Sequence, residues 1–374
     1  MLKKYTVDQL KEGMVVGQTV YREDMSVLLG EGTVLNQQMI DSLSERNIVS
    51  VEIREEGGEE ALAPMPQRAQ GTAEKTIPLK EPILDEGYVR DYGECFIELK
   101  ALFEVTKAHG FVDKDSAEVL AQNILPLCSG AKAVAHIHNM TLKGEYTIHH
   151  SLHVAILAGL MGKWLKMPQK DQLRLITAGF LILIGNLRIE KAMLDKEGVL
   201  TPDERKIMQE HPKFGHELIM AGGLGEDKEI AEAVLQYHER GDGSGYPRGL
   251  VKEEIGEFAR ILAIMDMYDA MASDRSYAKK RSPFEVFNIL ADDIMNGRLD
   301  TDFGFRFIRR VCHSLNGNWV KLSNGEAGKI IYIDESRLAS LPVVQTMDGE
   351  FMDLNLRTDV KAEYLLTSRE IEEE

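Results

Sequence analysis

The chain has 374 residues, which suggests two or three domains. Its 61 acidic and 44 basic residues give a net charge of −17, which disfavours broad binding to DNA, RNA or anionic membranes. Cys95, Cys128 and Cys312 show no Cys-x-x-Cys spacing, and the longest uncharged apolar run, 175–187, is too short to span a bilayer. We therefore expect a cytoplasmic protein with reduced thiols and no membrane span.

Residues 1–53 predict a small N-terminal α+β domain. Short apolar runs predict strands at 14–16, 19–21, 26–29 and 49–53, and a helix at 39–47 that is capped near Asn36. From residue 54 to 82 the apolar period is lost among glutamate, glycine and proline, so this segment is predicted to be a flexible linker.

Helical periodicity begins near Tyr88 and governs the middle of the chain. We assign 83–145 to a helical brace, with its second helix over 119–134, and 146–315 to an all-helical module. Residues 316–374 predict two hairpins, because Asn324-Gly325 supplies the positive φ of a tight turn. The predicted fold is mainly α, with the N-terminal α+β domain and a C-terminal β-rich appendage.

The stretch from Gln236 to Pro247 is the most informative in the chain. It combines His238 and Arg240 with two acids, three glycines and a proline. Neither a helix interior nor a strand tolerates this composition, so we predict an ordered loop that leaves a helix near His238. Ordered loops of this kind often carry function.

Residues 238–247 resemble the Gly-Tyr-Pro signature of the HD-GYP proteins, bacterial phosphodiesterases of cyclic di-GMP with the all-helical HD metal-hydrolase fold. Further landmarks of that family run from Tyr146 to about Gly297. They include His150-Ser151, Leu194-x-Lys196, His211-Pro212, Asp266-x-Tyr268-Asp269 and Asp274-Arg275-x-Tyr277. The resemblance implies the HD fold, and the chemistry then depends on the metal ligands.

The family holds two metals with imidazoles and carboxylates, which generate a hydroxide nucleophile and neutralise the phosphodiester. This chain departs from that pattern at the centre. Ile182 and Leu183 replace the family His-Asp pair, Asn186 replaces the lysine that follows, and Tyr237 breaks a histidine pair. We therefore assign no catalytic residue.

Four positions of the family ligand set survive: His150, His211, His238 and Asp266. One interpretation is a single divalent metal, manganese, iron or zinc, on three imidazoles and a carboxylate. The other, which we favour, is a vestigial cluster without a cofactor, in which Asp266 hydrogen-bonds a histidine and favours its protonated form. Four further histidines, His136, His138, His149 and His153, are predicted to be helix-surface or packing residues.

The positions that match the ligand side of the family are better preserved. Arg275, Tyr277, Lys279 and Lys280 form a basic group with an aromatic ring, which suits phosphate and guanine. The resemblance places them beside bound cyclic di-GMP; helix capping by the basic run is the alternative. It also implies that Gly245-Tyr246-Pro247 contacts GGDEF-domain diguanylate cyclases, against the alternative of a rigid structural loop.

We therefore expect a catalytically degenerate HD-GYP protein, a regulatory or scaffold protein in bacterial cyclic di-GMP signalling. It would bind a protein partner, with the nucleotide as a second ligand. One alternative is a metal-dependent cyclic di-GMP phosphodiesterase with a reduced metal site. Another is a purely structural dimerisation module. The sequence leaves open the partner, nucleotide binding and whether the chain forms a homodimer.

Overall fold

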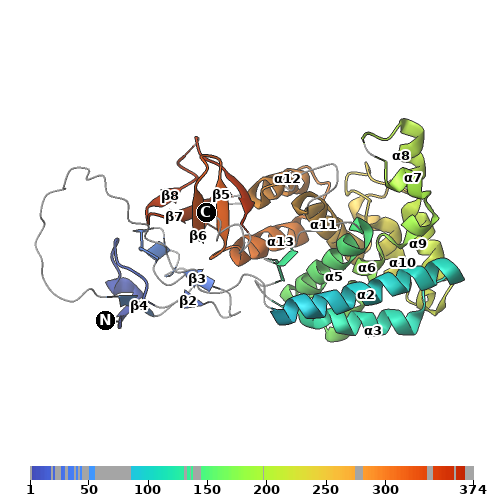
Figure 1. Cartoon of the computed structure of the whole chain (residues 1–374), viewed down its shortest axis with the longest axis horizontal. Coiled ribbons are helices and arrows are strands. Elements are labelled where there is room, and N and C mark those ends of the chain that lie inside the picture. The colour runs from blue at the N-terminus through green and yellow to red at the C-terminus, as the bar shows by residue number, and fades with distance from the viewer. Residues whose placement is uncertain are drawn as a thin grey trace, which may run out of the picture.

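The protein is mainly helical, with strands near both ends of the chain (Figure 1), as the sequence predicts. The computed structural model describes residues 2–17, 20–21, 27–29, 33–37, 39–40, 43, 50–54, 86–129, 133–134, 136–137, 145–196, 198–273, 281–334, 340–357 and 359–366. None of the helices within these ranges is both long enough and apolar enough to cross a membrane.

Short antiparallel strands form the N-terminal unit. β1 (Leu2–Thr6) leads into a 3-10 turn, Val7–Gln9, and pairs with β4 (Ser50–Arg54), while β2 (Val20–Tyr21) pairs with β3 (Val27–Leu29). The prediction missed β1, whose two lysines interrupt its apolar pattern, and the expected strand at 14–16 makes only isolated bridges. Asn36 accepts a hydrogen bond from the Met39 amide at 2.9 Å, as a helix cap does, but most of the helix expected at 39–47 lies outside the described residues. So does the predicted linker beyond Arg54.

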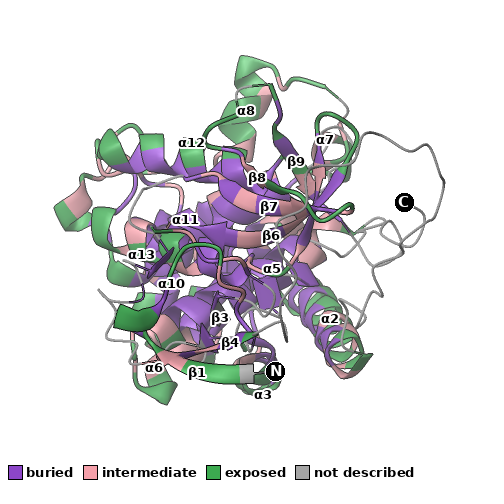
Figure 2. Ribbon diagram, turned by 90° about the vertical axis from the view of Figure 1, so that its left-hand side faces the viewer, coloured by how far each residue is buried: buried purple, intermediate pink, exposed green. Residues whose placement is uncertain are grey.

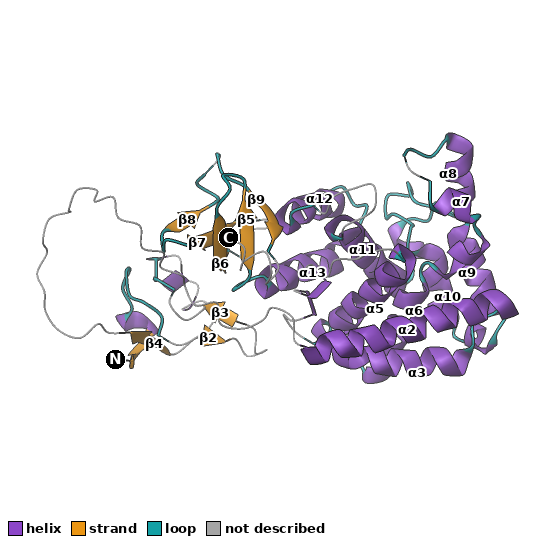
Figure 3. Ribbon diagram, in the orientation of Figure 1, coloured by secondary structure: helices purple, strands orange, loops and turns teal. Residues whose placement is uncertain are grey.

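Two helices lie side by side along one edge of the helical region (Figure 3). They are α2 (Glu86–His109), close to its predicted start, and α3 (Lys114–Ile124). The prediction of a second helix through residue 134 was wrong, because α3 ends at Ile124 and a 3-10 turn, Leu125–Leu127, follows. Pro126 explains this end, since proline lacks the amide that would continue the helix.

The helical module surrounds α5 (Tyr146–Trp164), which is buried over most of its length (Figure 2). An almost uniformly apolar helix of this kind belongs in a core, where neighbours cover it on several sides. Its main neighbours are α6 (Gln169–Leu181) and α11 (Glu257–Ala272). The other elements are η3 (Ile184–Arg188), α7 (Lys191–Leu194), α8 (Pro202–Met208), α9 (His211–Met220), η4 (Gly223–Glu226), α10 (Lys228–Gln236), η5 (Lys252–Glu254), α12 (Pro283–Met295) and α13 (Thr301–Ser314).

A five-stranded antiparallel sheet follows α13, in the order β8-β7-β6-β5-β9. Its strands are β5 (Trp319–Leu322), β6 (Ala327–Ile333), β7 (Pro342–Thr346), β8 (Phe351–Asp353) and β9 (Ala362–Leu365). The predicted hairpins β5–β6 and β7–β8 are present, and Gly325 takes a φ of 91° in the first turn. The sequence did not indicate β9, which pairs with β5.

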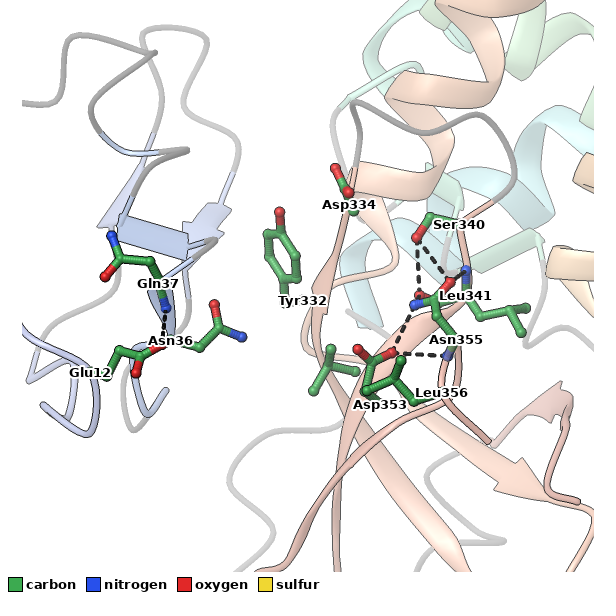
Figure 4. Close-up of a pocket in the computed structure, with 11 residues that line it drawn as sticks. Glu12, Asn36, Gln37, Tyr332, Asp334, Ser340, Leu341, Asp353, Asn355 and Leu356 are labelled. Carbon is green, nitrogen blue, oxygen red and sulfur yellow. Dashed lines mark hydrogen bonds between the residues drawn. The ribbon is translucent and has the colours of Figure 1, made fainter. Parts of the chain in front are cut away.

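The sheet packs on both the helical module and the N-terminal unit. Val320 and Ile330 belong to the main helical core, whereas Tyr332 and Val343 pack with Leu35 and other residues of the N-terminal core. Between the sheet and the N-terminal unit lies a cavity of about 400 Å³, with Tyr332 between the two sides (Figure 4). The residues that line this cavity include none of the predicted site residues.

Candidate functional site

The four surviving ligand positions come together in one cluster at the centre of the helical module. His150 lies on α5, Asp266 on α11, His211 at the first position of α9, and His238 just after α10. His150 Nε2 lies 3.0 Å from Asp266 Oδ1, and His238 Nδ1 lies 3.8 Å from Asp266 Oδ2. The rings of His211 and His238 meet edge to face at 5.2 Å.

A glycine brings the substituted segment 182–186 against this cluster. A Cβ added to Gly185 would lie 1.9 Å from the carbonyl oxygen of His211, so any side chain there would collide with backbone. The close approach packs η3 on the start of α9. It also keeps Ile182, which is fully buried, in the core of the module.

Two carboxylates of α11 hold His150 as a cation. His150 Nδ1 donates to Asp269 Oδ2 at 2.7 Å and Nε2 donates to Asp266 Oδ1 at 3.0 Å. Ionised carboxylates only accept, so both ring nitrogens carry protons. Burial opposes this charge, but the hydrogen bonds to Asp266 and Asp269 outweigh it and raise the pKa of His150 to about 9. Asp266 therefore does pair with a histidine, as expected.

Asp269 extends the cluster beyond the predicted residues. It accepts hydrogen bonds from His153 Nδ1 and from Ser273 Oγ, each at 2.8 Å. His153, predicted to be a helix-surface or packing residue, is fully buried, which agrees with the packing alternative, but it also donates to this carboxylate, which was not predicted. The signal was present in the sequence, since Asp269 follows Asp266, and His153 follows His150, by three residues on one helix face.

Tyr237 satisfies the lone pair of His211. The Met208 carbonyl accepts from His211 Nδ1 at 2.6 Å, so Nε2 is the acceptor and lies 2.5 Å from the Tyr237 hydroxyl. Burial lowers the pKa of His211 and raises the pKa of Tyr237, which keeps the imidazole neutral and the phenol protonated. Burial also lowers the pKa of His238 to about 3, despite the nearby Asp266. This half of the cluster is therefore neutral at pH 7.

These donors do not fit a two-metal centre. Ile182 and Leu183, which the sequence analysis aligns with a family ligand pair, offer no lone pair, His150 is protonated on both nitrogens, and Tyr237 occupies the free nitrogen of His211. Within the described ranges, no group of three or more histidine, cysteine or acidic side chains is arranged to hold a metal ion. Asn186, at the family lysine position, is half-buried.

The loop 239–250 is ordered by its own backbone and by one buried acid. Glu239 accepts from the amides of Arg248 and Leu250 at 2.7 and 3.0 Å. A Cβ at Gly245 would lie 2.3 Å from the Arg240 amide nitrogen, so this position requires glycine. Tyr246 folds back so that its ring lies 4.6 Å from that of His238.

The side chains predicted for nucleotide binding are not placed. Arg275, Tyr277, Lys279 and Lys280 lie outside the described residues, and so does His138. The adjacent Arg281 pairs with Glu285 at 3.1 Å. Nucleotide binding therefore remains a prediction.

Comparison with known proteins matches this helical module to a family. Residues 125–303 match the family model described as the HD domain. Residues 125–303 therefore form an HD domain. The chain is 30% identical over 232 residues to the cyclic di-GMP phosphodiesterase PA4108 of Pseudomonas aeruginosa. The matched region covers 61% of this chain and 52% of that protein. The chain is also 34% identical over 180 residues to the 3'3'-cGAMP-specific phosphodiesterase 3 of Vibrio cholerae. That matched region covers 48% of this chain and 38% of the Vibrio protein.

The chain spans about half or less of the length of these curated relatives. Among solved structures it is similar to Bd1817, described as an HDG"Y"P protein from Bdellovibrio bacteriovorus, with a TM-score of 0.48 and 14% identity. That similarity covers 82% of this chain and 98% of Bd1817.

The match to the HD domain begins at residue 125, so α2 and α3 lie outside it. One side chain of α2 nevertheless contacts the α5 histidines. The Tyr92 hydroxyl lies 2.9 Å from His149 Nδ1, and burial lowers the pKa of His149 to about 4. Tyr92 is not among the site residues that the sequence predicts.

Proposed function

We propose that this HD domain protein is a catalytically degenerate regulatory or scaffold protein of bacterial cyclic di-GMP signalling, which acts by binding a protein partner. One observation carries the proposal: the Tyr237 hydroxyl lies 2.5 Å from His211 Nε2, on the lone pair that a metal would need. The fully buried Ile182 at the end of α6 supports it, because an aliphatic side chain offers no metal ligand and adds apolar packing. The relatives named as cyclic dinucleotide phosphodiesterases support the signalling class.

The hydrogen-bonded cluster favours a structural role for these residues over a role in hydrolysis. HD phosphodiesterase chemistry draws on divalent metals, which supply a hydroxide nucleophile and neutralise phosphate charge. Here the protein's own carboxylates and phenol satisfy the imidazoles instead. His238, held beside Asp266, supports the Tyr246 ring and so gives the loop 239–250 a defined shape.

We propose that the protein partner binds the loop that carries Gly245, Tyr246 and Pro247. The proposed partner is a GGDEF-domain diguanylate cyclase. The loop presents Asp242, Ser244 and Arg248 to solvent. Cyclic di-GMP is the proposed second ligand, with Arg275, Tyr277, Lys279 and Lys280 as its contacts. Their guanidinium, ammonium and phenol groups suit phosphates and a guanine face.

Hydrolysis is tested by metal analysis of the purified protein and by a cyclic di-GMP turnover assay with added manganese. We expect no turnover from the natural chain. The combined substitutions Ile182→His, Leu183→Asp and Tyr237→His restore three ligands, two imidazoles and a carboxylate, and we expect this variant to retain more manganese after dialysis. Turnover by the natural chain would overturn the proposal and favour the alternative of a phosphodiesterase with a reduced, one-metal site.

Binding is tested by calorimetric titration with a GGDEF-domain diguanylate cyclase. Arg248→Ala changes the exposed loop, and Arg188→Ala, an exposed arginine paired with Glu217 on another element, is the matched control. We expect only Arg248→Ala to weaken binding. Unchanged binding in both variants would exclude this surface.

Cyclic di-GMP is titrated separately into the metal-free protein, with Arg275→Ala as the variant expected to lose binding. If neither the cyclase domain nor the nucleotide binds, the regulatory proposal fails. The alternative of a structural dimerisation module would then be examined by light scattering.

A further inference from the structure

α2 lies outside the HD domain match but contacts two histidines of α5, the central helix of that domain. Tyr92 is 2% exposed, and its hydroxyl lies 2.9 Å from His149 Nδ1. The Tyr92 ring also lies 5.7 Å from the ring of His153. One turn further along α2, Phe96 lies 4.4 Å from the ring of His149. A helix outside the HD domain therefore defines the surroundings of two side chains within it.

An unbroken series of hydrogen bonds joins His153 to Asp266. His153 Nδ1 lies 2.8 Å from Asp269 Oδ1, and Asp269 Oδ2 lies 2.7 Å from His150 Nδ1. His150 Nε2 then lies 3.0 Å from Asp266 Oδ1. Every residue in this series is buried, so water does not screen the contacts.

The orientation of His153 depends on its ring neighbours more than on hydrogen bonds. Its Nε2 atom is buried and has no hydrogen-bond partner among the described residues. The fully buried imidazole donates to Asp269, and the Tyr92 ring lies 5.7 Å from it. His153 and His150 both donate to Asp269. A change in the orientation of His153 therefore changes the orientation of the carboxylate to which His150 donates.

We propose that Tyr92 is a positioning residue for the polar cluster and that α2 is mechanically coupled to His150 through His153 and Asp269. The N-terminal unit precedes α2 in the chain, and Tyr92 lies less than two helical turns after the start of α2 at Glu86. Displacement of α2 therefore reaches the centre of the HD domain. This inference goes beyond the proposed function, and it holds whatever the centre binds.

The test uses the full chain labelled with ¹⁵N-histidine, in metal-free buffer without nucleotide or partner. Long-range ¹H–¹⁵N spectra report the ring nitrogens of each histidine. Tyr92→Phe removes only the hydroxyl, and we expect changed signals from His149 and also from His153 and His150. Tyr92→Leu removes the ring as well, so it is expected to shift the His153 signals further.

Tyr88→Phe is the matched control, one turn earlier on the same helix. The Tyr88 ring stacks on His136 at 3.9 Å, so the control should alter the His136 signals and leave His153 and His150 unchanged. If Tyr92→Phe changes only His149, or if Tyr88→Phe shifts His150 equally, Tyr92 is an ordinary packing residue and the inference fails.

Hydrogen exchange supplies a second readout, taken on the amides of residues 239–247. Loss of one hydrogen bond of typical net strength corresponds to a change of roughly two- to tenfold in opening. We expect exchange in this loop to accelerate within that range in Tyr92→Phe and to stay unchanged in Tyr88→Phe. Identical loop exchange in both variants would overturn the coupling. The outcome does not depend on whether the proposed partner or nucleotide binds.

Discussion

The two halves of the central cluster hold buried histidines in opposite charge states. On the α5–α11 side, carboxylates accept from both nitrogens of His150, and the pKa rises to about 9. On the α9–α10 side, a phenol and a carbonyl satisfy His211, and burial lowers its pKa. His150 and His211 are 1% and 4% exposed, so burial alone does not decide the charge. The neighbouring hydrogen-bond acceptors decide it.

The largest loss of stability is expected when the charged half of the cluster loses a carboxylate. Asp269→Asn leaves the His150 cation with one carboxylate and deprives His153 of an anionic partner. Removing one member of a buried ion pair typically costs roughly 3–5 kcal/mol of unfolding free energy, and we expect a loss of that size in urea denaturation. Asp292→Asn on the exposed surface of α12 is the control, expected to change stability by less than about 0.5 kcal/mol. Equal losses would refute the ion-pair account.

A pH series separates the two halves because their shifts have opposite signs. The pKa of His150 is raised from 6.5 to about 9, so its stabilisation is complete below pH 6.5 and is lost as the pH rises through about 9. The pKa of His238 is lowered from 6.5 to about 3, so folding is weakened as the pH falls below 6.5 toward 3.

Each limb has a limiting slope of about 1.4 kcal/mol per pH unit for one proton. Urea denaturation across this range should therefore show a maximum near pH 6.5, although other groups also contribute on the acid side. Titration of the ¹⁵N-histidine signals should give separate midpoints for His150 and His238. Midpoints near 6.5 for both residues would remove the distinction between the halves.

Tyr237→Phe tests the neutral half. The substitution removes the hydroxyl that donates to His211 Nε2 and leaves a buried lone pair unsatisfied. We expect a loss of roughly 1–3 kcal/mol in the free energy of unfolding. A double-mutant cycle with His211→Leu isolates the pair, and additive effects of the two substitutions would show that the hydrogen bond contributes nothing.

The smallest effect is expected at the loop above the neutral half. Tyr246→Leu removes the ring that lies 4.6 Å from His238, and we expect a loss of about 1 kcal/mol because aromatic contacts of this kind are worth about that much. Water would then reach His238, and its pKa should rise toward the usual value because burial is what lowers it. An unchanged His238 midpoint in the NMR titration would contradict this explanation.

Predictions that rest on local backbone preferences or on the cost of burying charge were confirmed, whereas a pairing between distant strands was missed. The Asn324-Gly325 turn and the ordered loop at Gly245 depend on backbone preferences of a few adjacent residues. The pairing of Asp266 with a histidine followed from the cost of burying an unpaired carboxylate. By contrast, β9 was missed because its place in the sheet depends on β5, about forty residues earlier.

The sequence by itself determined the HD fold class, the apolar character of Ile182 and Leu183, and the composition of the loop around Tyr246, because these depend on residue identity and local pattern. The tertiary structure alone decided which histidine carries charge. His150 lies 116 and 119 residues before the two carboxylates that bond it. Only the packing of α5 against α11 brings these groups within hydrogen-bonding distance, and the same packing makes His153 and Asp269 part of the centre. The packing of α2 against α5 adds Tyr92.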